Sequence, residues 1–312
     1  MSSDALNPVW AVVSSYRPGS GLADVVSSVM AQVTGVVVVD DGSGPVADMA
    51  LDNAETLGAV VLRLSKNSGI AAALNHGVEH AIASGARAFV TLDQDSELPS
   101  GFVDALLALH ASISRSELLP GPVVPEIFAG VRQAGPDPSS GLLVARNAIQ
   151  SGMLISRDVL DAVGRFREDF FIDLVDTEFE LRCAAAGYVT YAAPGLSLGH
   201  QLGTRYSVGG PLGVALRSHA VTLSSPLRYY YRARNRVRLE KMYGSRYRWR
   251  LTRDGFVERV HFLLAFLIAK PHRPMWGVLR AGLRSGRRDG AGRAPDEVEM
   301  LAARVTWNAR QI

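Results

Sequence analysis

The stretch Ala88-Phe-Val-Thr-Leu-Asp-Gln-Asp-Ser-Glu97 is a short apolar segment that ends in two carboxylates, Asp93 and Asp95. Its first five residues have the length and composition of a buried β-strand. The two acids stand two residues apart, so a strand projects both from one face, and the turn that follows lets them converge. Paired carboxylates suit Mg²⁺ or Mn²⁺, which take oxygen ligands. The alternative for this pair is a helix cap or a solvated turn.

Strand-like and helix-like segments alternate around this stretch. Apolar runs end at Ser15, Asp40 and Leu64, and residues at helical spacing follow them. This alternation is typical of a doubly wound α/β sheet, which binds ligands at the carboxyl ends of its strands. Four acids fall at those ends: Asp40, Asp41, Asp93 and Asp95.

Two nucleotide-binding signatures are missing from the sequence. No Gly-x-Gly-x-x-Gly follows the first strand, which removes the main support for a dinucleotide-dependent dehydrogenase. No Gly-x-x-x-x-Gly-Lys-Ser/Thr occurs, which argues against a P-loop kinase. Acids at strand ends repel phosphate directly. They can instead bind a divalent ion, which in turn binds the phosphates.

Composition and charge divide the chain unevenly. The 312 residues include one cysteine, Cys183, which excludes a disulfide framework and suits a reducing cytoplasm. We expect no signal peptide in Met1–Pro8, and no apolar segment approaches the roughly 20 residues that span a bilayer. Residues 205–293 hold 20 of the 33 Lys and Arg but 4 of the 30 Asp and Glu. A basic C-terminal third indicates an anionic partner: a membrane surface, nucleic acid or phosphate.

A second acidic stretch lies at residues 170–188. Asp173, Asp176 and Glu180 recur at helical spacings of three and four. A helix cap and a favourable helix dipole explain one or two of these acids. A carboxylate near apolar walls can also act as a general base, which we assign to Asp176. His200, after a further strand, is either a structural residue or a metal or phosphate contact.

The basic third interleaves Arg with Tyr and Trp over residues 228–250. This pattern fits a nucleic-acid surface with stacking residues, or a plain helix face with snorkelling arginines. An apolar run at Val260–Ala269 and the Arg280–Arg293 cluster favour docking on an anionic membrane surface over a buried helix hairpin or nucleic acid. The segment Gly282–Ala294 is predicted to be flexible.

Four segments, taken in order, resemble glycosyltransferase family 2 with the GT-A fold. They are Val-Val-Asp40-Asp41-Gly-Ser, Asn67-Ser-Gly69-Ile-Ala-Ala-Ala-Leu-Asn75, Leu-Asp93-Gln-Asp95-Ser and Phe171-Ile-Asp-Leu-Val-Asp176-Thr-Glu178-Phe-Glu-Leu-Arg182. The last segment, with Arg228-Tyr-Tyr-Tyr-Arg-Ala-Arg-Asn-Arg236 and Lys241-Met-Tyr-Gly244, resembles the bacterial L-rhamnosyltransferases of that family. The resemblance implies a catalytic domain at 1–204, with a nucleotide-sugar half at about 9–115 and an acceptor half at about 120–204. A basic helical region follows at 205–312.

The resemblance also implies roles for single residues. Asp40 and Asp41 would contact the nucleotide base or ribose, Asn67 and Gly69 would shape the loop near the nucleoside, and Asp93 would lie near the ribose. Asp95 and His200 would bind the metal. Asp176 matches the general base. The family's preceding Glu is Val175 here, so Asp173 and Glu178 stay open as alternative bases.

The function implied is metal-dependent, inverting transfer of L-rhamnose from dTDP-L-rhamnose to a glycan or polyprenyl-linked acceptor. It would serve bacterial cell-wall and surface polysaccharide synthesis, at the cytoplasmic face of the inner membrane. The alternatives are another donor (UDP-galactose, UDP-glucose or UDP-GlcNAc), a nucleotidyltransferase, and a non-catalytic nucleotide- or RNA-binding protein. A nucleotidyltransferase should carry a Gly-rich basic loop after the first strand, of which Ser14–Ser20 is a faint version.

Overall fold

In the computed structural model, which describes residues 6–200, 203–207 and 220–312, the apolar runs of the first hundred residues form the parallel half of a sheet. The order of the described strands is β3 (Val60–Arg63), β2 (Gly35–Asp40), β1 (Val9–Ser15), β4 (Ala88–Asp93), β9 (Met153–Ser156), β5 (Pro120–Phe128), β10 (Val189–Leu198), β8 (Leu143–Ala145) and β7 (Ala134–Pro136), with β6 (Val131–Arg132) beside β5. The predicted α/β sheet is confirmed, but beyond β4 it is mixed rather than mostly parallel, because β9 runs antiparallel to both of its neighbours.

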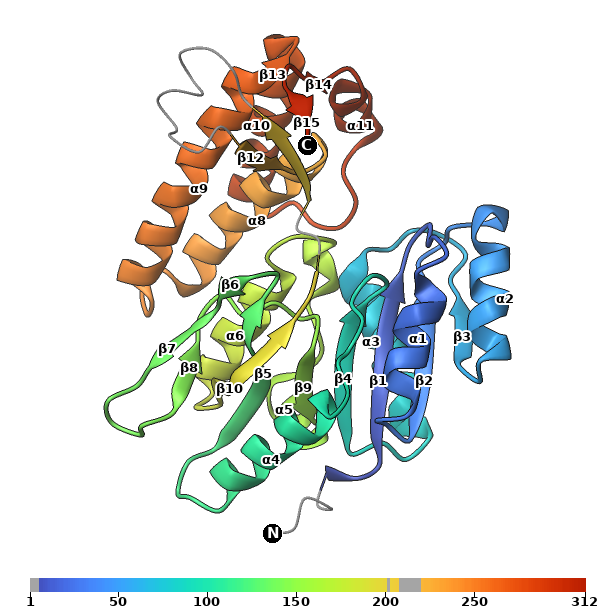
Figure 1. Ribbon diagram of the computed structural model, residues 1–312. Helices are drawn as coiled ribbons and strands as arrows, with labels where there is room; N and C mark the ends of the chain where they lie inside the picture. Colours follow the sequence, from blue (N-terminus) through green and yellow to red (C-terminus); the bar gives the residue numbers. More distant parts are fainter. Residues whose placement is uncertain (1–5, 201–202, 208–219) are drawn as a thin grey trace. The chain divides into compact units, whose positions relative to one another are not determined.

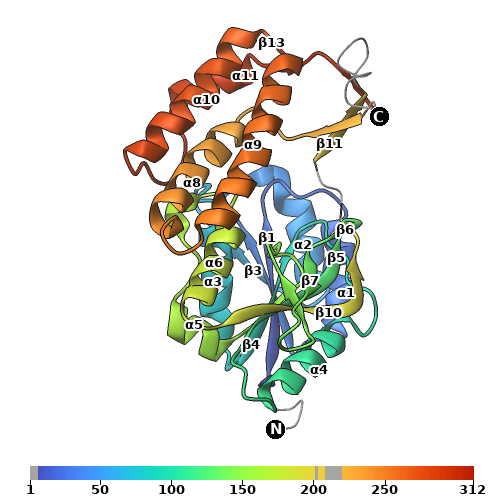
Figure 2. The ribbon, with the colours of Figure 1, turned by 90° about the vertical axis from the view of Figure 1, so that its left-hand side faces the viewer.

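Helices cover both faces of this sheet (Figures 1 and 2). One face carries α1 (Leu22–Met30), α2 (Asp48–Thr56) and α4 (Phe102–Ser114), and the other carries α3 (Ile70–Ala83), α5 (Arg157–Val163) and α6 (Val175–Ala185). Strands with two covered faces are buried along their length, which is why they are apolar runs without alternation. Gly77 of α3 lets that helix approach the sheet, because a Cβ there would lie 2.4 Å from Val12 Cγ1.

The strand β5 departs from what the sequence predicts. Residues from about 120 to 140 are rich in Gly and Pro, a composition that predicts a crossover or an excursion from the sheet. The structure instead places β5 between β9 and β10, inside the sheet. Its partner β10 slips register between Ala193 and Ser197, an irregularity that accommodates a strand containing prolines.

The chain divides into two compact units. The N-terminal unit comprises Met1–Glu168 and Val175–His200, and the C-terminal unit comprises Asp169–Leu174 and Gln201–Ile312. The chain first passes from the N-terminal to the C-terminal unit within the short 3₁₀ helix η3 (Glu168–Phe170). A second 3₁₀ helix, η2 (Pro45–Ala47), lies within the N-terminal unit and precedes α2. A six-residue piece of the C-terminal unit therefore interrupts the sequence of the N-terminal unit.

The C-terminal unit is mainly helical among its described residues. Its elements are α8 (Arg228–Tyr243), α9 (Arg248–Ile268), α10 (His272–Arg287), α11 (Asp296–Ala303), a small sheet of β11 (Thr204–Ser207), β12 (Ala220–Leu223) and β15 (Arg310–Gln311), and the pair β13 (Ala269–Lys270) and β14 (Thr306–Trp307). No helix in the described part of the chain is both long and apolar enough to cross a bilayer.

The helices α8 and α10 cross at close range. A Cβ on Gly282 would lie 2.4 Å from the carbonyl oxygen of Tyr230, and one on Gly286 would lie 2.5 Å from that of Arg234. Both glycines are buried against backbone. The first part of the segment that the sequence predicts to be flexible, residues 282–287, is therefore the packed end of α10. The tyrosines of α8 are buried in the same core, with Tyr229, Tyr230 and Tyr231 at most 3% exposed. They do not form the stacking surface that a nucleic acid would require.

Candidate active site at the carboxyl ends of the strands

Polar side chains tie together the carboxyl ends of β1, β2 and β4. Gln94, which stands between the two acids after β4, accepts hydrogen bonds from Ser15 Oγ (3.1 Å) and from the Tyr16 N–H (2.8 Å). The Arg17 N–H donates to Ser43 Oγ (2.6 Å), whose hydroxyl in turn donates to Asp40. The three strand ends predicted to meet therefore share one hydrogen-bonded edge.

Asp40 and Asp41 are both buried, and each shapes a loop. Asp40 Oδ2 accepts from the Ser43 N–H (2.9 Å), which closes the turn after β2. Asp41 accepts from the N–H groups of Ser68 (2.6 Å) and Gly69 (2.8 Å), at the start of α3. Burial raises the pKa of the Asp41 carboxyl, while the hydrogen bonds from Ser68 and Gly69 act in the opposite direction. Asp41 thus supports the loop that the sequence predicts to lie near a nucleoside.

The loop before α3 fits closely against the turn after β2. A Cβ on Gly42 would lie 2.6 Å from the Asn67 nitrogen, and Gly69 has φ of 96°, a conformation that favours glycine. Asn67 Oδ1 is buried and accepts no hydrogen bond from the described residues. Buried oxygens of proteins usually accept a hydrogen bond from protein or water.

Asp93, Asp95 and His200 form the single group in the described residues with the chemistry of a metal site. One carboxylate oxygen from each acid and one imidazole nitrogen lie within 4.8 Å of one another. His200 Nδ1 lies 3.4 Å from Asp95 Oδ1 and 3.1 Å from Ser96 Oγ, and the ring stacks at a tilt on Phe128, with centroids 5.0 Å apart. Two carboxylates and one imidazole suit Mn²⁺ or Mg²⁺, so the donor set fits the predicted ion.

Residues of the segment before β9 orient Asp93. Its N–H donates to Ser151 Oγ (3.0 Å), and its Oδ1 accepts from Gln150 Nε2 (2.5 Å). Asp93 was predicted to contact the ribose, and its carboxylate lies with the predicted metal ligands. Neither Gln150 nor Ser151 was predicted, because their spacing in the sequence gives no sign that they meet β4.

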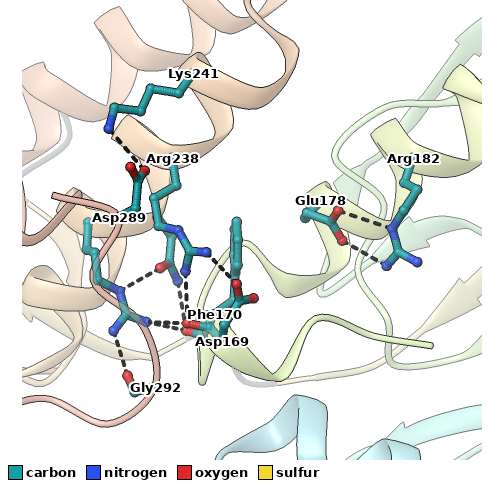
Figure 3. Close-up of polar contacts among 10 residues, drawn as sticks. Asp169, Phe170, Glu178, Arg182, Arg238, Lys241, Asp289 and Gly292 are labelled. Carbon is teal, nitrogen blue, oxygen red and sulfur yellow. Dashed lines mark hydrogen bonds and ion pairs between the residues drawn. The ribbon is translucent and has the colours of Figure 1, made fainter. Parts of the chain in front are cut away.

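The acids around the start of α6 have different surroundings. Glu178 is fully buried and accepts from Arg182 Nε (3.1 Å) and Nη2 (2.9 Å), a pair that Figure 3 shows. Glu180 is buried and accepts from the Ala148 N–H (3.1 Å). Asp173, in the C-terminal unit, accepts from Arg228 Nη2 (2.6 Å). Asp176 is partly exposed in the first turn of α6, and its Oδ1 accepts from the Thr177 N–H (2.7 Å).

Comparison with known proteins relates this arrangement to a family of enzymes. Residues 10–116, which run from the second residue of β1 past β4 and include all of the strand-end acids, match the model of glycosyl transferase family 2. This part of the chain is similar to family 2 glycosyltransferases, and the protein is a glycosyltransferase. A dTDP-rhamnosyl transferase of Shigella flexneri, RfbF, is 28% identical to this glycosyltransferase over 243 residues, which are 73% of this chain and 78% of the relative. The chain is thus similar to a bacterial rhamnosyltransferase.

Solved structures support the GT-A fold of the glycosyltransferase. A crystal structure of residues 1–349 of S. aureus TarS superposes with a TM-score of 0.51 at 12% identity, covering 94% of this chain and 82% of TarS 1–349. A longer TarS structure gives a TM-score of 0.56 at 15% identity, covering 94% of this chain and half of that one. At these identities the likeness concerns the fold alone.

Proposed function

We propose that this glycosyltransferase is a metal-dependent, inverting enzyme that moves L-rhamnose from dTDP-L-rhamnose to a glycan or polyprenyl-linked acceptor in cell-surface polysaccharide synthesis. The similarity to RfbF supports the donor. The grouping of Asp93, Asp95 and His200 at the sheet edge where the buried Asp41 also lies carries the proposal. A lipid-linked acceptor would place the enzyme at the cytoplasmic face of the membrane.

Asp95, His200 and Asp93 would hold Mg²⁺ or Mn²⁺ at the carboxyl end of β4. The bound ion would neutralise the donor diphosphate and stabilise the charge that grows on it as it leaves. Asp40 and the loop of Asn67 and Gly69 would bind the nucleoside. Gln150 would keep the Asp93 carboxylate oriented through its hydrogen bond to Oδ1, and Ser151 would hold the Asp93 backbone N–H.

Asp176 would take the proton from the acceptor hydroxyl. The rival Glu178 is fully buried, so an acceptor hydroxyl would reach the partly exposed Asp176 more readily. Attack of the acceptor oxygen on the anomeric carbon forms the new C–O bond as the bond to the diphosphate breaks. A single displacement of this kind inverts the anomeric configuration and needs no nucleophilic carboxylate.

A donor screen tests the proposal. Hydrolysis of dTDP-L-rhamnose, UDP-galactose, UDP-glucose and UDP-GlcNAc is measured with Mg²⁺, with Mn²⁺ and with EDTA. We expect turnover of dTDP-L-rhamnose that EDTA abolishes and that Asp95→Ala lowers by about a thousandfold. Glu79→Ala, which removes an exposed carboxylate of α3, is the control and should leave turnover unchanged. Equal turnover in EDTA would refute the metal, and preference for a UDP-sugar would refute the donor.

A further inference from the structure

One face of α9 carries a line of exposed apolar side chains. Large side chains that are 44 to 84% exposed recur at spacings of seven, four, three and four residues: Trp249, Phe256, Val260, Leu263 and Leu267. This spacing places all five along one side of the helix. Buried residues of α9, such as Ala265 and Ile268, belong to the core of the C-terminal unit. Single exposed apolar residues are ordinary, whereas a continuous stripe indicates an interaction surface.

Basic residues accompany this apolar stripe. Arg253 falls within it, four residues after Trp249, and Lys270 and Arg273 are exposed just beyond its end. Trp276 of α10 is 55% exposed, and its ring meets Phe266 edge to face at 6.3 Å. Residues 201–312 together contain 22 Lys and Arg against 7 Asp and Glu.

We propose that this stripe is a docking surface for an anionic lipid bilayer, with α9 lying in the plane of the interface. Apolar side chains would enter the acyl boundary, and tryptophans favour the headgroup level. Arg253 can extend its guanidinium to the headgroups from within an apolar face. A second copy of the chain fits less well, because it would bring two strongly basic surfaces together. The proposal extends the lipid-linked acceptor suggested above but does not depend on the donor.

Vesicle flotation of the full-length protein tests the docking surface. We expect co-flotation with phosphatidylcholine vesicles that contain phosphatidylglycerol, weak binding to phosphatidylcholine alone, and loss of binding at high salt. The double variant Phe256→Ser/Leu263→Ser should bind about tenfold less, because it removes two apolar contacts. Met300→Ser, which changes an exposed residue of α11, is the control.

Unchanged binding of the double variant, or no binding of the parent to anionic vesicles, would overturn the proposal. A stable dimer that the double variant dissociates would overturn it in favour of a second copy. Donor hydrolysis without vesicles is measured in parallel. If that activity is absent while vesicle binding follows the expected pattern, the proposed function fails and the docking surface stands.

A second inference comes from the six residues Asp169–Leu174, which precede α6. None of the six is a glycine, yet three have a left-handed backbone conformation: Phe171 (φ 64°), Asp173 (φ 64°) and Leu174 (φ 61°). Each such residue costs on the order of 1 kcal/mol, so a run of this kind persists only where surrounding contacts fix it. Strain of this kind tends to mark functional segments.

Side chains of α8 fix this segment through its carbonyl oxygens. Asn235 Nδ2 donates to the carbonyls of Phe170 (3.0 Å), Ile172 (2.9 Å) and Asp173 (2.7 Å). Arg234 Nη2 donates to the Phe170 carbonyl (2.7 Å). Arg238 Nη1 donates to the Asp169 carbonyl (3.0 Å), and Figure 3 shows these two residues. Arg228 adds the ion pair with the Asp173 carboxylate.

We infer that Asn235 and Arg228 are positioning residues for transfer. The segment that they hold continues directly into α6, whose second residue is Asp176. This inference rests on the role proposed for Asp176.

Kinetics of Asn235→Ala and of the milder Arg228→Gln test the positioning role. We expect kcat for transfer to fall about tenfold while the KM for donor stays within about twofold, because the donor residues belong to other segments. Arg293→Ala, which breaks an exposed ion pair in the same unit, is the control. Folded variants with unchanged kcat, or with kcat and KM altered alike, would overturn the inference. Full activity of Asp176→Asn would instead overturn the proposed base.

Discussion

Two regions of the molecule use charge in different ways. One is the set of carboxyl ends of β1, β2 and β4, and the other is the clamp, the side chains of α8 that hydrogen-bond to Asp169–Leu174. At the strand ends, acids are held by hydroxyl, amide and backbone N–H groups, as Asp41 is held by the start of α3. In the clamp, guanidinium groups meet carboxylates and carbonyl oxygens, so their charge is matched within the fold. Carboxylates gathered at the edge of a sheet can hold a cation, whereas arginines bonded to carbonyl oxygens hold the chain in place.

Asp176 and the buried Glu178 stand on the same helix, and replacing Asp176 should have the larger effect on catalysis. Asp176→Asn should lower kcat for transfer by about a hundredfold or more, because an amide cannot accept the acceptor proton. Donor affinity, measured by calorimetry, should stay within about twofold, since the amide keeps the size of the carboxylate and the proposed role of Asp176 concerns the acceptor. If donor binding and transfer fall together, the base lies elsewhere.

The buried pair of α6 should contribute to stability rather than to catalysis. Arg182→Met leaves the Glu178 carboxylate buried without its bidentate partner, which should cost about 3 kcal/mol or more. Denaturant unfolding measures the change. The matched control is Arg63→Met, because Arg63 forms exposed ion pairs with Asp52 and Glu55 and should contribute less than about 1 kcal/mol. Equal costs for the two variants would remove the distinction between buried and exposed pairs.

The contact between α8 and α10 should tolerate a methyl group at one glycine and not at another. Gly282→Ala should lower the free energy of unfolding by about 2 kcal/mol, because its Cβ would meet the Tyr230 carbonyl at 2.4 Å. Gly277 lies on the same helix, and its Cβ would meet only the mobile end of the Leu301 side chain, at 3.1 Å. Gly277→Ala should therefore be near neutral, helped by the better helix propensity of alanine.

The smallest expected effect is a pH dependence in the C-terminal unit. Burial, with Arg232 acting in the same direction, lowers the pKa of His261 from 6.5 to about 4. Between these values the unfolded chain takes up a proton that the folded unit does not, so stability falls as the pH drops from 6.5 towards 4. Because His261 is only half-buried, we expect a loss of about 1 kcal/mol.

His261→Gln should flatten this dependence in thermal unfolding between pH 7.5 and 4.5. The exposed His272 of the same unit gives the control, His272→Gln. A dependence that survives in His261→Gln would assign it to other groups.

Local sequence patterns were sufficient to predict that acidic residues gather where the carboxyl ends of the first strands meet. The runs that became β1, β2 and β4 are apolar and end in acids or turns, so their carboxyl ends could be placed at one edge without knowing any long-range contact. The strand β5 was missed because its prolines argue against a central strand, and only the irregular pairing with β10 reconciles them.

The contacts of α8 could not be predicted, because their partners lie far away in the sequence. Arg234 and Asn235 bind carbonyls about sixty residues earlier, and no periodicity in residues 228–250 records that. Glycines at Gly282 and Gly286 suggested flexibility, while their function is close contact with backbone. Helical spacing equally could not separate Asp176 from Glu178, since what distinguishes them is burial and the reach of Arg182.

The interrupted sequence of the N-terminal unit limits how this enzyme can be recombined. The chain passes between the two units three times, after Glu168, after Leu174 and after His200. A chimera joined only at His200 would combine one parent's Asp169–Leu174 with the other parent's α8, and the amide and guanidinium donors would have to match foreign carbonyls. Exchanging donor specificity between relatives therefore calls for moving both stretches together.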